Sequence, residues 1–274
     1  MNSTVNSEWL RLLNSILTDG VTVSPRNMVT LELIGVTSKI PMNNPVLTIG
    51  ARKISYRFMV AEAAWILNGD NKVSTIEPYC RQMSQYSDDG IFLAGAYGPR
   101  IKDQLPYILA CFEQDIQSRQ AIIQVWRTCP NKSKDIPCTV SIQFLIRNNK
   151  IHTIVNMRSS DTWLGWPYDV FNFSMLTTFV LLHLKKFPKT ATLELGELTL
   201  TTGSQHIYEH TVLHARQCIM ESSKCWNCNP IKTSEFKAPD DLIQHLQALR
   251  DNYYEGCNAT FMMEKQTVER TKYV

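Results

Sequence analysis

The amino-acid sequence predicts an α+β fold in a single domain that spans residues 1–274. Residues 140–146 alternate between apolar and polar side chains, which is the pattern of a half-buried strand. Residues 54–67 and 167–186 are instead apolar over runs of helical length. Strand and helix patterns follow one another without a strict βαβ rhythm, and no internal repeat or low-complexity linker divides the chain.

The expected elements follow from local patterns in chain order. The first helix places Trp9, Leu13 and Ile16 at helical spacing and ends before Gly20. The alternating, β-branched run at residues 21–36 predicts a strand or a hairpin, and residues 95–100 predict a glycine-flanked aromatic loop. We expect helices at residues 7–17, 54–67, 103–117, 167–186 and 240–254, with a further helix that holds His210 and His214, and strands at 121–126, 140–146, 151–158 and 193–201.

Composition narrows the class of protein. The formal net charge of +3 is too small to indicate a nucleic-acid surface, so we expect none to be required. The chain has eight cysteines but begins without a secretory signal, which predicts reduced thiols and a cytoplasmic location. Its apolar runs are too short to span a bilayer. The pair Cys225 and Cys228 lacks the further ligands of a zinc site, so we expect no metal.

Cys138 and Glu62 suggest nucleophilic attack and proton transfer, respectively. Cys138 follows a proline at the start of a strand, and Arg119, Arg158 and Ser159 occur near strand ends. Guanidinium groups beside a thiol would lower its pKa and supply the nucleophilic thiolate, and arginines with a serine also suit a phosphate monoester. Glu62 lies in an apolar helix, where burial would raise its pKa for proton transfer. The plainer alternatives are a small buried cysteine and an exposed helix acid.

These residues occur within a longer series of motifs. The series comprises Glu62-x-x-Trp65, Gly69-Asp70, Ser118-Arg119, Pro137-Cys138, Gln143-Phe144, Arg158-Ser159-x-Asp161, Leu164-Gly165-x-Pro167 and His206-x-Tyr208. In this order it resembles the thymidylate synthase family, and most closely its deoxycytidylate (dCMP) hydroxymethylase members. The resemblance extends from about Arg26 to His210 and fades after Cys218.

The resemblance implies a fold, a cosubstrate and residue roles. The fold would be a large mixed β-sheet with flanking helices that packs sheet to sheet in a homodimer. Cys138 would add to C6 of a pyrimidine nucleotide, C5 would attack the methylene of 5,10-methylenetetrahydrofolate, and Glu62 would move protons. The resemblance also implies that Arg26, Arg158 and Ser159 bind the phosphate, and that Arg119 reaches the phosphate of the partner. His206 and Tyr208 would contact the sugar. Asp161 would contact the base and the folate, and Trp65 and Tyr97 would contact the folate pocket.

One departure from the family concerns the base. Asp169 stands where thymidylate synthases have an asparagine, whose amide matches N3 and O4 of uracil. A carboxyl group can accept from N4 of cytosine and share a proton with N3. We therefore expect Asp169 to bind the base, and the substrate to be dCMP. A first-turn acid favoured by the helix dipole is the alternative reading of Asp169.

A second departure concerns the step after C5 attack. The segment from Cys80 to Tyr86 has no tryptophan, and the chain ends Lys272-Tyr273-Val274 rather than in a small apolar tail. A wetter site would let water complete the reaction as 5-hydroxymethyl-dCMP, as in bacteriophages that modify their cytosine. The alternatives are a dCMP methyltransferase that uses the folate hydride, a CMP hydroxymethylase, a dUMP-specific thymidylate synthase, and a non-catalytic nucleotide-binding or RNA-binding descendant.

Overall fold

The computed structural model describes residues 4–129, 132–226, 228 and 230–251. Its centre is a six-stranded sheet in the order β1-β2-β6-β5-β4-β3. The strands β5 and β6 are parallel, and every other neighbouring pair is antiparallel. The bounds are Val21–Val23 for β1, Thr30–Pro41 for β2, Ile122–Gln124 for β3, Thr139–Arg147 for β4, Lys150–Asp161 for β5 and Glu194–Tyr208 for β6.

A tight turn joins the antiparallel strands β4 and β5. Between β4 and β5, Asn148 and Asn149 have φ angles of 50° and 58°. Asparagine tolerates this left-handed region, and a two-residue turn with both φ values positive matches the twist of a hairpin. The turn pairs Arg147 with Lys150, and the expected hairpin at residues 140–158 is confirmed.

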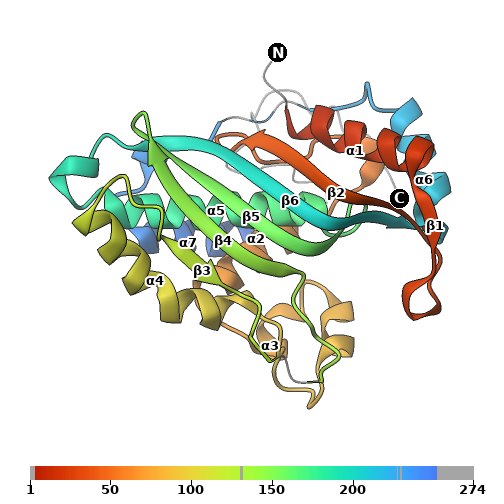
Figure 1. Cartoon of the computed structure of the whole chain (residues 1–274), viewed down its shortest axis with the longest axis horizontal. Coiled ribbons are helices and arrows are strands. Elements are labelled where there is room, and N and C mark those ends of the chain that lie inside the picture. The colour runs from red at the N-terminus through yellow and green to blue at the C-terminus, as the bar shows by residue number, and fades with distance from the viewer. Residues whose placement is uncertain (1–3, 130–131, 227, 229, 252–274) are drawn as a thin grey trace.

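The helix α5 (Trp166–Leu184) connects the parallel strands β5 and β6 and forms the core. It is apolar on nearly every side, and most of its residues are buried. In Figure 1, α5 lies behind the sheet together with α2 (Tyr56–Leu67) and α7 (Pro239–Asp251), while no helix of the described residues covers the centre of the front face. Residues of the helix α5 can therefore project between the sheet and α2.

The remaining helices lie at the margins of the sheet. Helix α1 buries Trp9, Leu12, Leu13 and Ile16, and its N-terminus is closed by a capping box at Thr4. The bounds are Val5–Asp19 for α1, Val73–Ile76 for α3, Tyr97–Gln114 for α4 and Val212–Met220 for α6. In the part of the chain that the structure describes, no helix is long and apolar enough to cross a membrane, and no cluster of three metal-ligating side chains occurs.

Two sequence predictions need correction. The expected loop at residues 95–100 is wrong from Tyr97 onward, because α4 begins there and Pro99 falls in its first turn, where proline is tolerated. The strand expected to end at residue 201 continues to Tyr208. Gly203 permits this, since a Cβ at that position would lie 2.9 Å from the carbonyl oxygen of Arg158 on the neighbouring strand. The expected end of the last helix, Tyr254, lies outside the described residues.

Candidate active site

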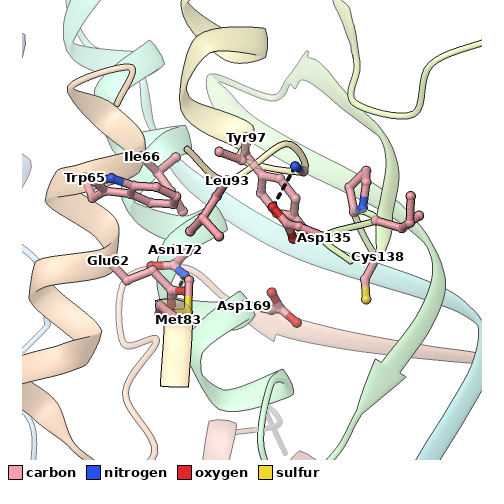
Figure 2. A pocket seen from close by; sticks show the side chains of 14 residues that line it. Glu62, Trp65, Ile66, Met83, Leu93, Tyr97, Asp135, Cys138, Asp169 and Asn172 are labelled. Carbon is pink, nitrogen blue, oxygen red and sulfur yellow. Dashed lines mark hydrogen bonds between the residues drawn. The ribbon is translucent and has the colours of Figure 1, made fainter. Parts of the chain in front are cut away.

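A cavity of about 180 Å³ lies where α2, α4, α5 and the start of β4 meet. Five of the residues that the sequence singled out line it: Glu62, Trp65, Tyr97, Cys138 and Asp169. In Figure 2 the carboxyl group of Asp169 points into the space between Glu62 and Cys138. The structure thus brings the expected nucleophile, the expected proton carrier and the expected base-reading residue to one place.

Cys138 is held just before β4 by the end of β5. The backbone N–H of Arg158 donates to the carbonyl of Cys138 at 2.8 Å. The guanidinium of Arg158 donates to the carbonyls of Ile136 and Pro137, both at 3.0 Å. It also reaches the Cys138 Sγ at 3.8 Å, and the hydroxyl of Ser159 lies 3.6 Å from the same sulfur. Arg158 therefore fixes the backbone that carries the thiol as well as contacting the sulfur.

The charge state of this thiol differs from the sequence expectation. Arg158 and Ser159 do lower the pKa of Cys138, as expected. Burial acts more strongly in the opposite direction, and the carboxyl of Asp169 adds to it, so the pKa of Cys138 is raised overall. The prediction of a thiol with a lowered pKa is wrong for the protein without substrate, because the sequence could not show how deeply the sulfur lies.

Glu62 has the environment that its apolar helix predicted. Burial raises its pKa to about 7, although a hydrogen bond from Asn172 acts against this rise. Asn172 Nδ2 donates to Glu62 Oε2 at 2.8 Å. A carboxyl group that titrates near neutral pH can both accept and release protons under ordinary conditions.

Asp169 is the second acid of the cavity. Its pKa is raised well above the ordinary value, first by burial and then by the charges of Glu62 and Asp161. Its backbone N–H donates to the carbonyl of Gly165, which places it in the first turn of α5. Among the described residues, no hydrogen bond engages its side chain. A neutral carboxyl group that faces a cavity can offer one donor and one acceptor to a ligand.

Two aromatic side chains form the apolar part of the wall. The hydroxyl of Tyr97 accepts from the Thr139 hydroxyl at 3.0 Å, and its ring stacks on Phe173 with centroids 6.3 Å apart. Trp65 follows Glu62 by three residues and therefore shares its face of α2. Its indole nitrogen is buried without a partner among the described residues. Flat apolar surfaces of this kind suit a planar heterocycle.

A row of polar side chains continues from the thiol along the ends of β5 and β6. Ser159 pairs with Ser204, and Asp161 pairs with His206. The rings of His206 and Tyr208 lie 5.4 Å apart, and the Arg26 guanidinium lies beside the phenol of Tyr208. Asp161 Oδ1 accepts from the backbone N–H of Trp163 at 2.8 Å, while Oδ2 is buried with no partner among the described residues.

Arg119 is the one expected site residue that lies far from this group. It is exposed in the turn before β3, and its carbonyl accepts from the Gln143 side chain at 2.9 Å. Gln143 follows Cys138 by five residues along an extended strand. At about 3.3 Å per residue, Gln143 lies roughly 16 Å along the strand from Cys138, and Arg119 is held at that distant end.

Comparison with known proteins identifies the family of the chain. The family model of thymidylate synthase matches residues 7–241. The chain belongs to the thymidylate synthase family. A curated relative, the deoxyuridylate hydroxymethyltransferase of Bacillus phage SP01, is 28% identical over 222 residues, which cover 73% of this chain. The match covers 56% of that relative, so the chain spans little more than half the length of the protein it resembles.

In this thymidylate synthase family member, sequence reasoning gave no role to several residues of the cavity, and three of them bear on its chemistry. Asn172 binds Glu62, Asp135 accepts from the backbone N–H of Gly95 at 2.6 Å, and Met83 lies in the wall near Glu62 (Figure 2). Asn172 could have been found, because it follows Asp169 by three residues on a helix and must share its face. Asp135 and Met83 lie in irregular segments, where spacing predicts no direction.

Proposed function

We propose that this chain transfers a one-carbon unit from 5,10-methylenetetrahydrofolate to C5 of dCMP, and that water completes the reaction to give 5-hydroxymethyl-dCMP. Membership of the thymidylate synthase family supports a folate-dependent transferase that acts at C5 of a pyrimidine nucleotide. The observation that carries the choice of base is the carboxyl group of Asp169, which faces the same cavity as Cys138 and Glu62.

Asp169 suits cytosine because its raised pKa favours the protonated form of the carboxyl group. The acid can donate this proton to N3 of cytosine, which is an acceptor, while its second oxygen accepts from the N4 amino group. Proton sharing at N3 withdraws electrons from the ring and so favours addition of a thiolate at C6. Asp169 is thereby assigned two roles, recognition of the base and activation of it.

The covalent steps use Cys138 and Glu62. The thiol of Cys138 loses its proton and adds to C6, and C5 then attacks the folate methylene. Loss of the C5 proton and departure of the folate leave an exocyclic methylene on the ring. Water adds to this carbon, its proton passes to Glu62, and the electrons returned to the ring expel the Cys138 thiolate as the C5–C6 double bond re-forms. No oxidant or reductant is consumed in this sequence.

The lining near Glu62 supports water rather than hydride as the last reactant. The segment after Cys80 forms a 3₁₀ turn, Arg81–Tyr86, and contributes Met83 to the cavity. A thioether side chain is narrower and more flexible than an indole ring and covers a stacked folate less completely. The chain terminus that the sequence also implicated, residues 272–274, lies outside the described residues.

We further propose that Arg26, Arg158 and Ser159 bind the phosphate, that His206 and Tyr208 bind the sugar, and that Trp65, Tyr97 and Asp161 contact the folate. The strand residues among them continue from Cys138 along the ends of β5 and β6, Arg26 lies beside Tyr208, and Trp65 and Tyr97 line the cavity, which supports these assignments. The homodimer would pair the front faces of two sheets, where none of the described helices lies over the centre (Figure 1). Arg119, remote from its own thiol, would then serve the phosphate site of the partner.

The decisive experiment incubates the purified protein with methylenetetrahydrofolate and dCMP, dUMP or CMP, and identifies the products by mass spectrometry. Dihydrofolate is followed by absorbance in the same reactions. We expect hydroxymethyl-dCMP without dihydrofolate. Methyl-dCMP with one dihydrofolate per turnover would overturn the water step, and a product from CMP would overturn the preference for deoxyribose.

A second candidate is hydroxymethylation of dUMP. The printed name of the phage relative favours it. The chemistry also permits it, because a neutral carboxyl group can rotate to accept from N3–H of uracil and donate to O4. A product from dUMP alone in the same experiment would establish this candidate in place of the first.

A further inference from the structure

We propose that Asn172 is a positioning residue, whose Nδ2 holds Glu62 and whose Oδ1 holds the water that attacks the exocyclic methylene. This inference rests on the proposed function and gives a role in it to a residue that the structure, and not the sequence, singles out. The observations are one hydrogen bond, one unpartnered acceptor, and the place of both in the cavity.

The first observation is that Asn172 is committed to Glu62. Its Nδ2 donates to Glu62 Oε2 at 2.8 Å, across the contact between α5 and α2. The side chain of Asn172 is almost fully buried, with 7% of its surface exposed. A buried hydrogen bond between two helices fixes the rotamer of both side chains, so the second carboxylate oxygen of Glu62 has a defined direction.

The second observation is the other end of the same amide. Asn172 Oδ1 is buried, and no donor among the described residues reaches it. A buried acceptor without a partner is destabilising, so native proteins pair such atoms with a donor. The atom belongs to a side chain that lines the cavity, and in Figure 2 Asn172 lies next to Glu62 on the cavity wall.

A water molecule satisfies both residues at once. It can donate one hydrogen to Asn172 Oδ1 and the other to the carboxylate of Glu62, which leaves its lone pairs for the methylene carbon. Buried waters usually make about three hydrogen bonds, and a polar cavity of this size accommodates one. During attack, the hydrogen on Glu62 is transferred to that carboxylate, while the hydrogen on Asn172 stays with the product hydroxyl.

Other ionisable groups also act on Glu62. Asp169 and Tyr168 from α5 interact with its charge, as does Cys80 from the segment before the 3₁₀ turn. The pKa values of all three are raised by burial, so Tyr168 and Cys80 stay neutral near pH 7. Asp169 remains in every variant below, so its effect cancels in the comparison between variants.

The test compares Asn172→Leu, which removes both polar functions, with Asn172→Asp, which keeps an acceptor and removes the donor. Ser174→Ala is the matched control, because Ser174 is a buried polar residue of the same helix whose hydroxyl donates to the carbonyl of Val170. Release of tritium from 5-tritiated nucleotide is measured against pH. A second readout adds 2-mercaptoethanol, which competes with water for the methylene, and compares thioether with hydroxymethyl product by mass spectrometry.

We expect Asn172→Leu to move the ascending limb of the pH profile up by about one pH unit, because the bond that lowers the pKa of Glu62 is gone. We expect the thioether fraction to rise about fivefold to tenfold. Asn172→Asp should move the limb at least as far, through like-charge repulsion, but keep the wild-type product ratio. Ser174→Ala should change neither readout.

The proposal is overturned if Asn172→Leu leaves either the pH profile or the product ratio unchanged. It is also overturned if Ser174→Ala changes both readouts as Asn172→Leu does. If the leucine variant does not fold, a changed product ratio in Asn172→Asp overturns the role of Oδ1, and an unmoved pH limb overturns the role of Nδ2. Failure of the proposed function is a separate result, because the wild-type protein would then release no tritium or would release it without forming a hydroxymethyl product.

Discussion

At the scale of single residues, Glu62 shows how a buried carboxyl group lowers the stability of the folded protein. In the unfolded chain its carboxyl titrates near the ordinary value of about 4.3, whereas burial raises the folded pKa to about 7. Between these values the folded protein binds more protons than the unfolded chain, so the free energy of unfolding falls as the pH rises. The folded protein therefore has its full stability with respect to this group below about pH 4, and the stability that protonation of Glu62 provides is lost above about pH 7.

Replacement of this carboxyl group should therefore stabilise the protein under alkaline conditions. We expect Glu62→Gln to raise the free energy of unfolding by about 1–3 kcal/mol at pH 8 and to change it little at pH 5, while abolishing turnover. Urea unfolding at the two pH values measures this difference. An equal effect at both would show that Glu62 does not titrate between them.

Asp169 carries the prediction for base choice. Asn in its place offers a donor and an acceptor that match O4 and N3–H of uracil, and it leaves N3 of cytosine without a proton to share. We expect Asp169→Asn to shift the ratio of kcat/KM for dCMP over dUMP toward dUMP by about 10- to 100-fold. An unchanged ratio would remove Asp169 from base recognition.

At the scale of elements, the turn between β4 and β5 links the hairpin to the rest of the sheet. Asn148 and Asn149 both have positive φ, and Asn149 Nδ2 also donates to the carbonyl of Thr192 at 2.8 Å. We expect Asn148→Ala to cost about 1 kcal/mol through backbone strain, and Asn149→Ala about 2 kcal/mol because it loses the hydrogen bond as well. Chemical denaturation of the two variants measures the difference, and equal costs would show that the bond to Thr192 contributes nothing.

The 3₁₀ turn Arg81–Tyr86 should govern which reactant completes the chemistry. An indole at position 83 would cover the folate more fully and exclude water. We expect Met83→Trp to yield methyl product together with an equal amount of dihydrofolate, at the expense of the hydroxymethyl product. Met83→Leu, which keeps a flexible aliphatic side chain of similar size, is the control. A methyl fraction that stays at the wild-type level in Met83→Trp would exclude this segment from product control.

Most of these elements could be predicted because their patterns are local. The alternation in β4 and the apolar length of α5 both follow from side chains that one element buries by itself. The start of α4 at Tyr97 and the continuation of β6 to Tyr208 could not be predicted, because neighbouring glycines and a proline resemble a loop. Gly203 serves a close approach to Arg158 from another strand, which is a tertiary fact.

Some features of the candidate site could likewise be predicted from the sequence, and others could not. Cys138, Glu62 and Asp169 could be named from the sequence, since residue type and neighbours suggest their chemistry. The raised pKa of Cys138 could not, because burial and the Arg158 contact act in opposite directions and their balance depends on depth. Asn172 was missed because its value comes from a partner on another helix.

At the scale of the whole molecule, the position of Arg119 bears on the proposed homodimer. One chain supplies Cys138, Glu62 and Asp169 from its cavity, while its exposed Arg119 lies beside Gln143, which is roughly 16 Å along β4 from Cys138. If Arg119 binds the phosphate in the partner subunit, each active site of the homodimer draws on both chains. An Arg119→Ala dimer would then lack the arginine at both sites, and a Cys138→Ala dimer would lack the nucleophile at both.

Mixing the two inactive variants should restore activity by this logic. In a hybrid dimer, the site with intact Cys138 receives Arg119 from the Cys138→Ala chain, while the other site lacks both groups. After unfolding and refolding at equal concentrations, half of the dimers are hybrids with one intact site, so we expect about one quarter of the wild-type activity per chain. Mixing without refolding is the control, and Glu62→Gln with Cys138→Ala should restore nothing, because both residues belong to one cavity. A refolded Arg119→Ala and Cys138→Ala mixture that stays inactive would place the Arg119 function within its own chain or outside the reaction.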